Sequence, residues 1–307
     1  MTYAMSLPRH LEVRRDEPLS RHSTFGVGGP ADLWIEVSTV ADLVMTLDTA
    51  REAGVPRTVI GHGTNLLVAD AGIDGLVIAN SCKDLKFYPD ERLAHVESGH
   101  TMAQLARRAA KCGHAGLGFA IGVPGTVGGA VYGNAGAWGS DIAGVLVQAS
   151  IWYPGGIHQV QSKTLNFGYR ESSLQHDALA PVVLSATLRI QQGDPDELDA
   201  ELKTFSRRRA NTQPRGQTAG SFFKNPEGAY AGHLIESAGC KGCTYGGAFI
   251  SPMHANFIAN DGSAVASDIL ELALLVQRAV HVQFGVRLEP EVRVIGRWPA
   301  TAGQLVA

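Results

Sequence analysis

The stretch GVPGTVGGAVYGNAGAWG, from Gly122 to Gly139, decides how the rest of the chain is interpreted. It belongs to a longer segment, Gly113 to Gly144, in which glycine supplies 11 of 32 residues and hydrophobic periodicity fails. A loop-rich stretch of this length inside a compact domain is usually functional. Its bends allow the backbone to wrap a diphosphate or a planar ring, whereas the alternative is a flexible surface loop. The bends are predicted at Pro124-Gly125, Gly128-Gly129 and Asn134-Ala135-Gly136.

Composition excludes several classes of protein. Glycine accounts for 36 of 307 residues, but there is no Gly-X-Y period and 45 % of the residues are hydrophobic, so collagen, a flexible linker and disorder are excluded. The net charge of -3 offers no general attraction to nucleic acid or to an anionic membrane. No apolar run has the length of a signal peptide or a membrane span. We therefore expect a soluble, cytoplasmic protein, with no nucleic acid or membrane as partner.

Four scattered cysteines exclude a disulfide framework and suit a reducing compartment. Cys240 and Cys243 form a C-x-x-C motif, but no second ligand pair stands at zinc-site spacing, and we predict no metal. A structural role is the main interpretation of this pair. Redox or metal use stays open.

Strand and helix signals alternate along the first third of the chain, and sheet signals return after the glycine-rich segment. The polar run QQGDPD, residues 191–196, predicts a domain boundary before a mainly α+β C-terminal part. We expect strands at 33–37, 57–61, 76–79, 95–98 and 182–190, a hairpin of 145–153 with 157–161, a strand over 286–296, and helices at 40–53, 102–112, 197–209 and 266–284.

A second glycine-rich turn, GHGTNL from Gly61 to Leu66, follows a predicted strand. Gly61 and Gly63 let backbone amides approach a ligand, and Thr64 and Asn65 offer side-chain donors, which suits phosphate. The turn is neither a Walker loop nor G-x-G-x-x-G, because no Gly-Lys-Ser/Thr follows and position 66 is Leu. A plain tight turn is the alternative.

Three further segments carry a reactive side chain: FGYRESS with Arg170, AGSFFKNP with Ser221, and LEPEVRVIG with Glu289 and Glu291. Each has a structural alternative, namely a surface ion pair, a turn cap and an exposed strand position. On a strand, Glu289 and Glu291 would share one face, where burial would raise a carboxyl pKa and suit acid–base chemistry.

Taken together and in order, these motifs, with FGVGGPADL, GGAFIS and HANFIAN, resemble those of the UDP-N-acetylenolpyruvoylglucosamine reductase family, from about Phe25 to Gly296. The resemblance implies an α+β fold: a two-subdomain FAD-binding domain of the vanillyl-alcohol-oxidase type, then an α+β substrate-binding domain. The implied boundaries are an N-terminal extension at 1–20, a FAD domain at 21–191 with subdomains of about 21–80 and 81–191, and a substrate domain at 192–307. The short connection after Tyr169 resembles the compact class, which lacks an inserted substrate-capping segment.

The resemblance also implies the chemistry: NADPH reduces non-covalently bound FAD, which reduces the enolpyruvyl group of a UDP-sugar for peptidoglycan synthesis, in a protein expected to be a monomer. Arg170, Ser221 and Glu291 would be catalytic, with Ser221 as proton donor assisted by Lys224 or a water relay. Tyr169, Lys224, Asn225 and His254 would bind substrate. FAD would be held by Gly61, His62, Gly63, Thr64, Asn65, Leu66, Gly122, Val123, Pro124, Gly125, Thr126, Gly128, Gly129, Asn134, Ala135 and Gly136.

The sequence departs from the family pattern at Cys240, Cys243 and Met253, none of which is expected to touch the chemistry. Which of Arg207, Arg208 and Arg209 meets a phosphate is left open, with a solvated helix face as the alternative. Two other functions compete: a different flavin oxidase on the same scaffold, since fold does not fix function, and a non-enzymatic nucleotide-binding module.

Overall fold

The computed structural model describes residues 7–8 and 10–299, and these divide into two compact units. Two strands, β2 (Pro30–Val37) and β5 (Ile73–Asn80), continue from one unit into the other. Each unit is therefore assembled from segments far apart in the sequence. The first unit takes its described residues from Met1–Val13, Ile35–Gly61 and Val77–Arg209, and the second from Arg14–Trp34, His62–Leu76 and Ala210–Ala307.

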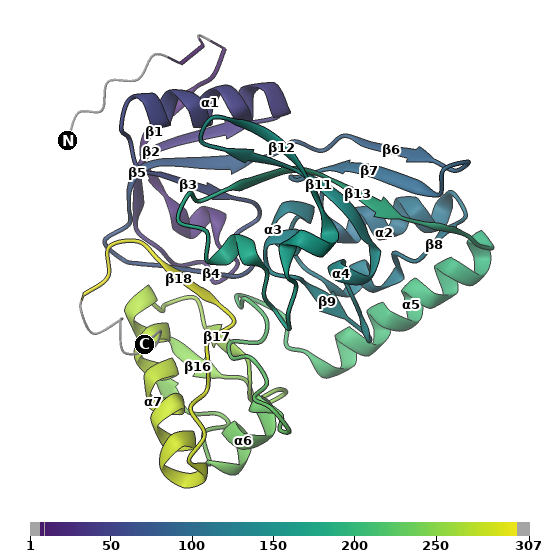
Figure 1. The fold of residues 1–307 in the computed structure, drawn as a ribbon. Helices are drawn as coiled ribbons and strands as arrows, with labels where there is room; N and C mark the ends of the chain where they lie inside the picture. Colours follow the sequence, from purple (N-terminus) through teal and green to yellow (C-terminus); the bar gives the residue numbers. More distant parts are fainter. Residues whose placement is uncertain (1–6, 9, 300–307) are drawn as a thin grey trace. The chain divides into compact units, whose positions relative to one another are not determined.

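The first unit contains a five-stranded antiparallel sheet in the order β12-β11-β13-β7-β6 (Figure 1). The predicted hairpin is confirmed, because Tyr153 pairs with Gly156 across the turn at Pro154-Gly155. The predicted strands at 95–98 and 182–190 are confirmed as well. The sheet consists of β12 (Gly156–Gln161), β11 (Leu146–Tyr153), β13 (Val182–Arg189), β7 (Leu93–Glu97) and β6 (Leu85–Tyr88).

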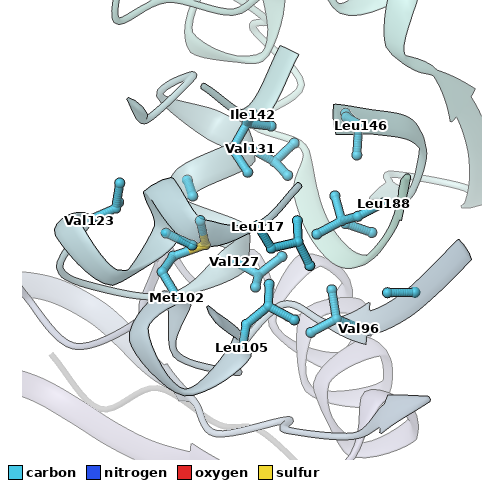
Figure 2. Packing of buried hydrophobic residues seen from close by; sticks show 14 of the residues in the cluster. Val96, Met102, Leu105, Leu117, Val123, Val127, Val131, Ile142, Leu146 and Leu188 are labelled. Carbon is cyan, nitrogen blue, oxygen red and sulfur yellow. The ribbon is translucent and has the colours of Figure 1, made fainter. Parts of the chain in front are cut away.

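The core of the first unit forms where helices α2 (Met102–Lys111) and α3 (Val127–Tyr132) pack on this sheet. Thr101 caps the start of α2, and its side chain accepts a hydrogen bond from the Gln104 backbone N–H, which satisfies one of the free donors of the first turn. Figure 2 shows the result, a cluster in which side chains of both helices and of the sheet meet: Val96, Met102, Leu105, Val127, Val131 and Leu188.

The glycine-rich segment is not the loop that its lost periodicity predicts. It contains α3, whose length of six residues is too short for a hydrophobic repeat to be visible in the sequence. Burial of Val127, Ala130 and Val131, rather than helix propensity, stabilises this helix, because glycine costs roughly 1 kcal/mol relative to alanine in a helix interior. The same segment holds η2 (Gly118–Gly122), β9 (Gly136–Ala137), β10 (Ser140–Asp141) and α4 (Ile142–Val145).

A four-stranded sheet has the order β1-β2-β5-β3, and its edge strand β1 (Val13–Pro18) comes from the segment expected as an N-terminal extension. The predicted strands and helix of this region are confirmed by β2, β5, β3 (Arg57–Ile60) and α1 (Val40–Glu52). The remaining elements of the first unit are β8 (His114–Ala115), η3 (Ser162–Leu165), η4 (Ser173–Gln175), β14 (Gln191–Gln192) and most of α5 (Pro195–Thr212), which confirms the helix predicted at 197–209.

In the second unit, helix α7 (Ala266–Phe284) has the predicted bounds and ends at Gly285, whose φ of 69° favours glycine. Its apolar face joins Phe222 and Phe223 in the core. A parallel pair joins β4 (Leu66–Val68) to β18 (Arg293–Ile295). The other elements are η1 (Leu19–His22), α6 (Ala231–Ser237), β15 (Thr244–Tyr245), β16 (Ala248–Ile250) and β17 (Ile258–Asn260).

The strand predicted over 286–296 is wrong for its first half, because only Arg293–Ile295 is a strand. Pro290 makes an isolated bridge with Phe223, and a proline has no N–H to extend a ladder. Glu289 is exposed and Glu291 half-buried, so the alternation expected of a strand does not describe this pair.

Candidate active site

In the first unit, the two glycine-rich turns predicted to hold a cofactor meet. A Cβ placed on Gly61 would lie 2.5 Å from Thr126 Oγ1 and 2.8 Å from Thr126 Cγ2. Only glycine permits this approach without displacing Thr126. The contact joins the end of β3 to the start of α3, although 65 positions separate the two residues.

The start of α3 is fixed by backbone contacts. Thr126 caps the helix, with its hydroxyl accepting from Gly129 N–H at 3.4 Å, and Gly128 N–H donates to the Ser98 carbonyl at 2.8 Å. A Cβ on Gly128 would lie 2.9 Å from Ser98 Cβ, whereas one on Gly129 would meet only Thr126 Oγ1, at 3.7 Å. Gly128 is thus required for packing, while the surface at Gly129 is open.

Side chains of helix α5 hold the first bend of the glycine-rich segment. Arg209 Nη1 donates to the Gly122 carbonyl at 2.5 Å, and burial lowers the pKa of this guanidinium. Trp138, whose backbone has a φ of 58°, stacks on Phe205 with ring centroids 5.4 Å apart, and the Arg208 guanidinium lies 5.1 Å from the indole centroid. Of the three arginines left open by the sequence, two therefore contact the glycine-rich segment, and Arg207 is exposed.

Asn134 links the end of α3 to the turn that carries Arg170. It is buried at 4 % exposure with a φ of 41°, and its side-chain amide donates to the Gly168 carbonyl at 2.8 Å and to Asp141 Oδ2 at 3.2 Å. Its Oδ1 accepts from Ala143 N–H at 3.0 Å. All these partners belong to the protein, so this side chain is used in holding the fold.

Arg170 sits in a tight turn with a φ of 59°, a left-handed conformation that is uncommon for a side chain of this size. The turn closes by paired backbone hydrogen bonds between Gly168 and Glu171. Its guanidinium lies 5.5 Å from the ring centroid of Tyr169, which is 55 % exposed. The turn thus presents a cation beside an exposed aromatic ring.

In the second unit, the remainder of the GHGTNL turn is built into the chain around it. Gly63 has a φ of 60°, and an added Cβ would overlap the His22 carbonyl oxygen. His62 is exposed, and Thr64 is half-buried. Asn65 donates its side-chain amide to the Glu291 carbonyl at 2.9 Å. Asn65 therefore positions the segment that carries Glu291.

The segment around Ser221 runs beside the segment around Glu291. Glu291 N–H donates to the Phe222 carbonyl at 2.8 Å, and Lys224 N–H donates to the Glu289 carbonyl at 2.8 Å. Because Phe222 and Phe223 are fully buried, they anchor the segment between half-buried Ser221 and Lys224. Lys224 Nζ lies 3.5 Å from Glu289 Oε2. The second unit thus brings two of the three predicted catalytic residues onto adjacent segments of the chain.

Asn256 is a site residue that sequence reasoning missed. It is 3 % exposed, and its side chain accepts from Phe223 N–H at 2.9 Å and donates to the Phe223 carbonyl at 2.8 Å. Its own carbonyl accepts from Phe222 N–H at 2.8 Å. Its place in the HANFIAN motif, two residues after His254, was the one indication in the sequence. Its partner Phe223 lies 33 residues away, so no local pattern reveals the contact.

Ser221, Asn225 and His254 together line a pocket of about 360 Å³ in the second unit. Burial lowers the pKa of His254, whose Nδ1 accepts from Asn256 N–H at 3.2 Å. A neutral imidazole with polar neighbours is suited to hydrogen bonding with a polar ligand. The other lining residues are Tyr230, Gly232, His233, Glu236, Met253, Ala255 and Asn256.

Among residues 7–8 and 10–299, no group of three or more His, Cys, Asp or Glu side chains is arranged to hold a metal ion. All four cysteines are free thiols. In the same part of the chain, no helix combines the length and the apolar character needed to cross a membrane.

Comparison with family models gives two matches. Residues 31–159 match the FAD binding domain model, and residues 212–295 match the model of the UDP-N-acetylenolpyruvoylglucosamine reductase C-terminal domain. The first match contains both glycine-rich turns and the second contains Ser221, Asn256 and Glu291.

Curated relatives and a solved structure are similar over most of the chain. The UDP-N-acetylenolpyruvoylglucosamine reductase of Rubrobacter xylanophilus is 44 % identical over 283 residues, which cover 92 % of this chain and 94 % of the relative. That of Anoxybacillus flavithermus is 43 % identical, with 93 % and 95 % covered. The crystal structure of the Thermus caldophilus enzyme of this name superimposes with a TM-score of 0.79 at 34 % identity, covering 94 % of this chain and 99 % of that one.

Proposed function

Because the chain belongs to the UDP-N-acetylenolpyruvoylglucosamine reductase family, we propose that its Arg170, Ser221 and Glu291 perform that family's reduction. The chain is an FAD-dependent reductase that uses NADPH to convert UDP-N-acetylglucosamine enolpyruvate to UDP-N-acetylmuramate in peptidoglycan precursor synthesis. Its α+β fold, with an FAD-binding domain of the vanillyl-alcohol-oxidase type, confirms the expected fold class. Family membership also decides against the other flavin oxidase and the non-enzymatic module.

Bound FAD supplies a hydride taken from NADPH, which goes to the β carbon of the enolpyruvyl double bond. Negative charge then develops through the α carbon into the carboxylate, and a fixed cation stabilises it. Arg170 suits this task, because the turn from Gly168 to Glu171 is closed by hydrogen bonds and tied to α3 through Asn134. Ser221 gives a proton to the α carbon, and Glu291 hydrogen-bonds the carboxylate.

One observation carries the assignment of the proton donor: Ser221 lies in a segment hydrogen-bonded on one side to the Glu291 segment and on the other to Asn256. A serine hydroxyl is a weak acid and is effective only when it is held in place. Lys224, half-buried and near Glu289, can assist the transfer through a water.

The residues proposed to hold FAD fit a cofactor bound through backbone groups. Gly61 and Thr126 bring the two turns together, and Gly129 keeps its surface open. We propose that Gly61 to Leu66 and Gly122 to Gly136 contact FAD by main-chain atoms, with Asn65 and Asn134 acting mainly by positioning. Tyr169, Lys224, Asn225 and His254 are proposed for the UDP-sugar, the last two from the pocket that Ser221 also lines.

Further parts of the proposal concern the whole chain. We propose a cofactor domain at residues 21–191 and a substrate domain at 192–307; the first compact unit extends beyond this boundary to Arg209. Four free thiols suit a reducing compartment, which supports a cytoplasmic location. We propose that the protein is a monomer. Supply of UDP-N-acetylmuramate for the cell wall would connect the enzyme to cell shape and division.

The test separates hydride transfer from protonation. We expect Ser221→Ala to leave FAD reduction by NADPH nearly unchanged and to slow reoxidation by the enolpyruvyl nucleotide by about 10²-fold or more, the usual contribution of a positioned proton donor. Stopped-flow absorbance of the flavin follows each half-reaction. Ser237→Ala, an exposed serine at the end of α6, is the matched control. Equal losses in both half-reactions would contradict the assignment, and a colourless wild-type protein would contradict the function.

A further inference from the structure

The C-x-x-C motif forms the turn that follows α6 in the second unit. Cys243 N–H donates to the Cys240 carbonyl at 3.0 Å, and Gly242 has a φ of 79°. These features describe a type II turn, in which the first and fourth Cα atoms lie within 7 Å. Disulfides form at Cα separations of about 4.4–6.8 Å. The turn therefore holds the two cysteines within bridging range.

The two thiols contact the carbonyls of neighbouring residues. Cys240 Sγ donates to the Ala238 carbonyl at 3.8 Å, and Cys243 Sγ donates to the Gly239 carbonyl at 3.7 Å. These carbonyls belong to consecutive residues at the end of α6, so the sulfur atoms are directed to neighbouring acceptors. Both S–H···O contacts are weak, and their loss opposes bridging only slightly.

The environments of the two thiols differ in a way that gives each a role. Cys240 is 3 % exposed, and its pKa is raised by burial and by the neighbouring Cys243. Cys243 is half-buried and more accessible to a reagent in solution. Because the thiolate is the attacking species and needs access to its target, Cys243 reacts first and Cys240 second.

We propose that Cys240 and Cys243 are a modification site, a dithiol that closes to a disulfide by exchange with a low-molecular-weight disulfide such as oxidised glutathione. The Cys243 thiolate attacks one sulfur of the reagent, which breaks the reagent's S–S bond, forms a mixed disulfide and releases one thiolate. Cys240 then attacks the Cys243 sulfur and releases the second thiolate. The two protein thiols are oxidised, the reagent is reduced to two thiols, and the two cysteine protons end on them.

The experiment uses the FAD-loaded full chain incubated under native conditions with oxidised glutathione, then alkylated, digested with trypsin without reduction and analysed by mass spectrometry. Trypsin cuts after Lys241, between the two cysteines. Reduced protein therefore yields two separate alkylated peptides, whereas closed protein yields one disulfide-linked pair. We expect the linked pair to become the main species, and dithiothreitol to reverse it.

Single variants test the order of the two steps. Cys240→Ser should accumulate a stable glutathione adduct on Cys243, because the resolving thiol is missing. Cys243→Ser should leave Cys240 largely unmodified. The wild-type protein contains matched controls. Cys112 is exposed and has no other cysteine near it in the sequence, so it should carry a glutathione adduct and form no disulfide within the protein. Cys82 is fully buried, with a pKa raised to about 12, and should stay unmodified while the fold is intact.

Two results would overturn the proposal. If wild-type protein accumulates a glutathione adduct on Cys243 that persists without closing, Cys240 is not a resolving thiol. If neither cysteine reacts while Cys112 does, the pair is only structural. Modification of Cys82 would indicate unfolding, and the incubation would then be repeated at lower reagent concentration until Cys82 is protected.

Discussion

At the scale of single residues, two buried asparagines each hold a segment that carries a proposed catalytic residue. Asn256 clamps both backbone groups of Phe223 beside Ser221, and Asn134 bonds Gly168 two residues before Arg170. An asparagine side chain offers a donor and an acceptor, so it can replace a missing backbone partner where no regular ladder forms. Each therefore fixes an irregular segment that carries a reactive group.

We predict that Asn256→Ala slows the substrate-dependent half-reaction by about 10- to 100-fold, because the Ser221 segment loses its clamp and small displacements are costly. Reduction of FAD by NADPH should change little. Asn260→Ala is the control, since Asn260 is also buried in the second unit but bonds the Phe25 carbonyl. The prediction fails if both variants lose stability in urea unfolding equally and neither slows reoxidation selectively.

For Asn134→Gly, we expect a loss of about 1–3 kcal/mol in the free energy of unfolding, because Asp141, Ala143 and Gly168 lose their hydrogen bonds to this buried side chain. Glycine accepts the φ of 41°, so this variant isolates the side chain from backbone strain. Urea denaturation measures the change. Asn134→Ala should be less stable still, and a glycine variant as stable as the wild type would contradict the proposed link.

At the scale of elements, the short helix α3 combines two uses of glycine that look alike in the sequence. Gly128 has Ser98 against it, whereas Gly129 is exposed and an added Cβ there would meet only Thr126 Oγ1 at an ordinary contact distance. A glycine inside a helix lowers stability relative to alanine, so one without a packing reason points to another requirement. Approach of a ligand to the backbone is the requirement that the proposed function supplies.

We predict that Gly129→Ala keeps or slightly raises the melting temperature of the apoprotein, by the roughly 0.5–1 kcal/mol that alanine contributes in a helix, while it weakens FAD binding. Gly128→Val should instead lower stability with or without FAD, since its Cβ would press on Ser98. Thermal melts with and without added FAD, together with the flavin absorbance retained after gel filtration, distinguish the two. Full FAD retention by Gly129→Ala would show that this surface does not face the cofactor.

The sequence predicted long, periodic elements well and the irregular ones poorly. Helix α7 was predicted with its observed bounds, because Ile269, Leu272 and Val276 repeat at helical spacing and Gly285 ends the pattern. Helix α3 was missed, because one and a half turns show no period. The strand predicted at 286–296 failed at Pro290, which makes an isolated bridge with Phe223, a residue 67 positions earlier. Contacts of this kind depend on the tertiary fold and leave no local pattern.

At the scale of the whole molecule, a buried histidine in each unit makes the stability of the fold depend on pH. Burial lowers the pKa of His100 in the first unit and of His254 in the second, below the ordinary 6.5. In the window from 6.5 down to each lowered pKa, the unfolded chain binds protons that the folded chain does not. The stabilising effect of higher pH is therefore complete above about 6.5 and is lost as the pH falls through this window.

We predict a lower free energy of unfolding at pH 5.5 than at pH 7.5. For each unit by which folding lowers a histidine pKa, the free energy of unfolding falls by about 1.4 kcal/mol once the pH has dropped through that unit. Urea unfolding at several pH values measures the slope. His100→Gln should flatten it, whereas His158→Gln, at an exposed strand position, should not. An unchanged slope in His100→Gln would show that this histidine does not contribute.

The parallel pairing of β4 with β18 has a consequence for synthesis of the chain. Leu66 pairs with Arg293, so an apolar strand made early must wait for 227 further residues before its partner exists. At translation rates of roughly 5–20 residues per second, the wait is about 10–50 s. During that interval Leu67 and Val68, both buried in the finished protein, have no permanent cover. The second unit therefore closes only after β18 has been synthesised, and binding by a chaperone is most useful while the nascent chain waits.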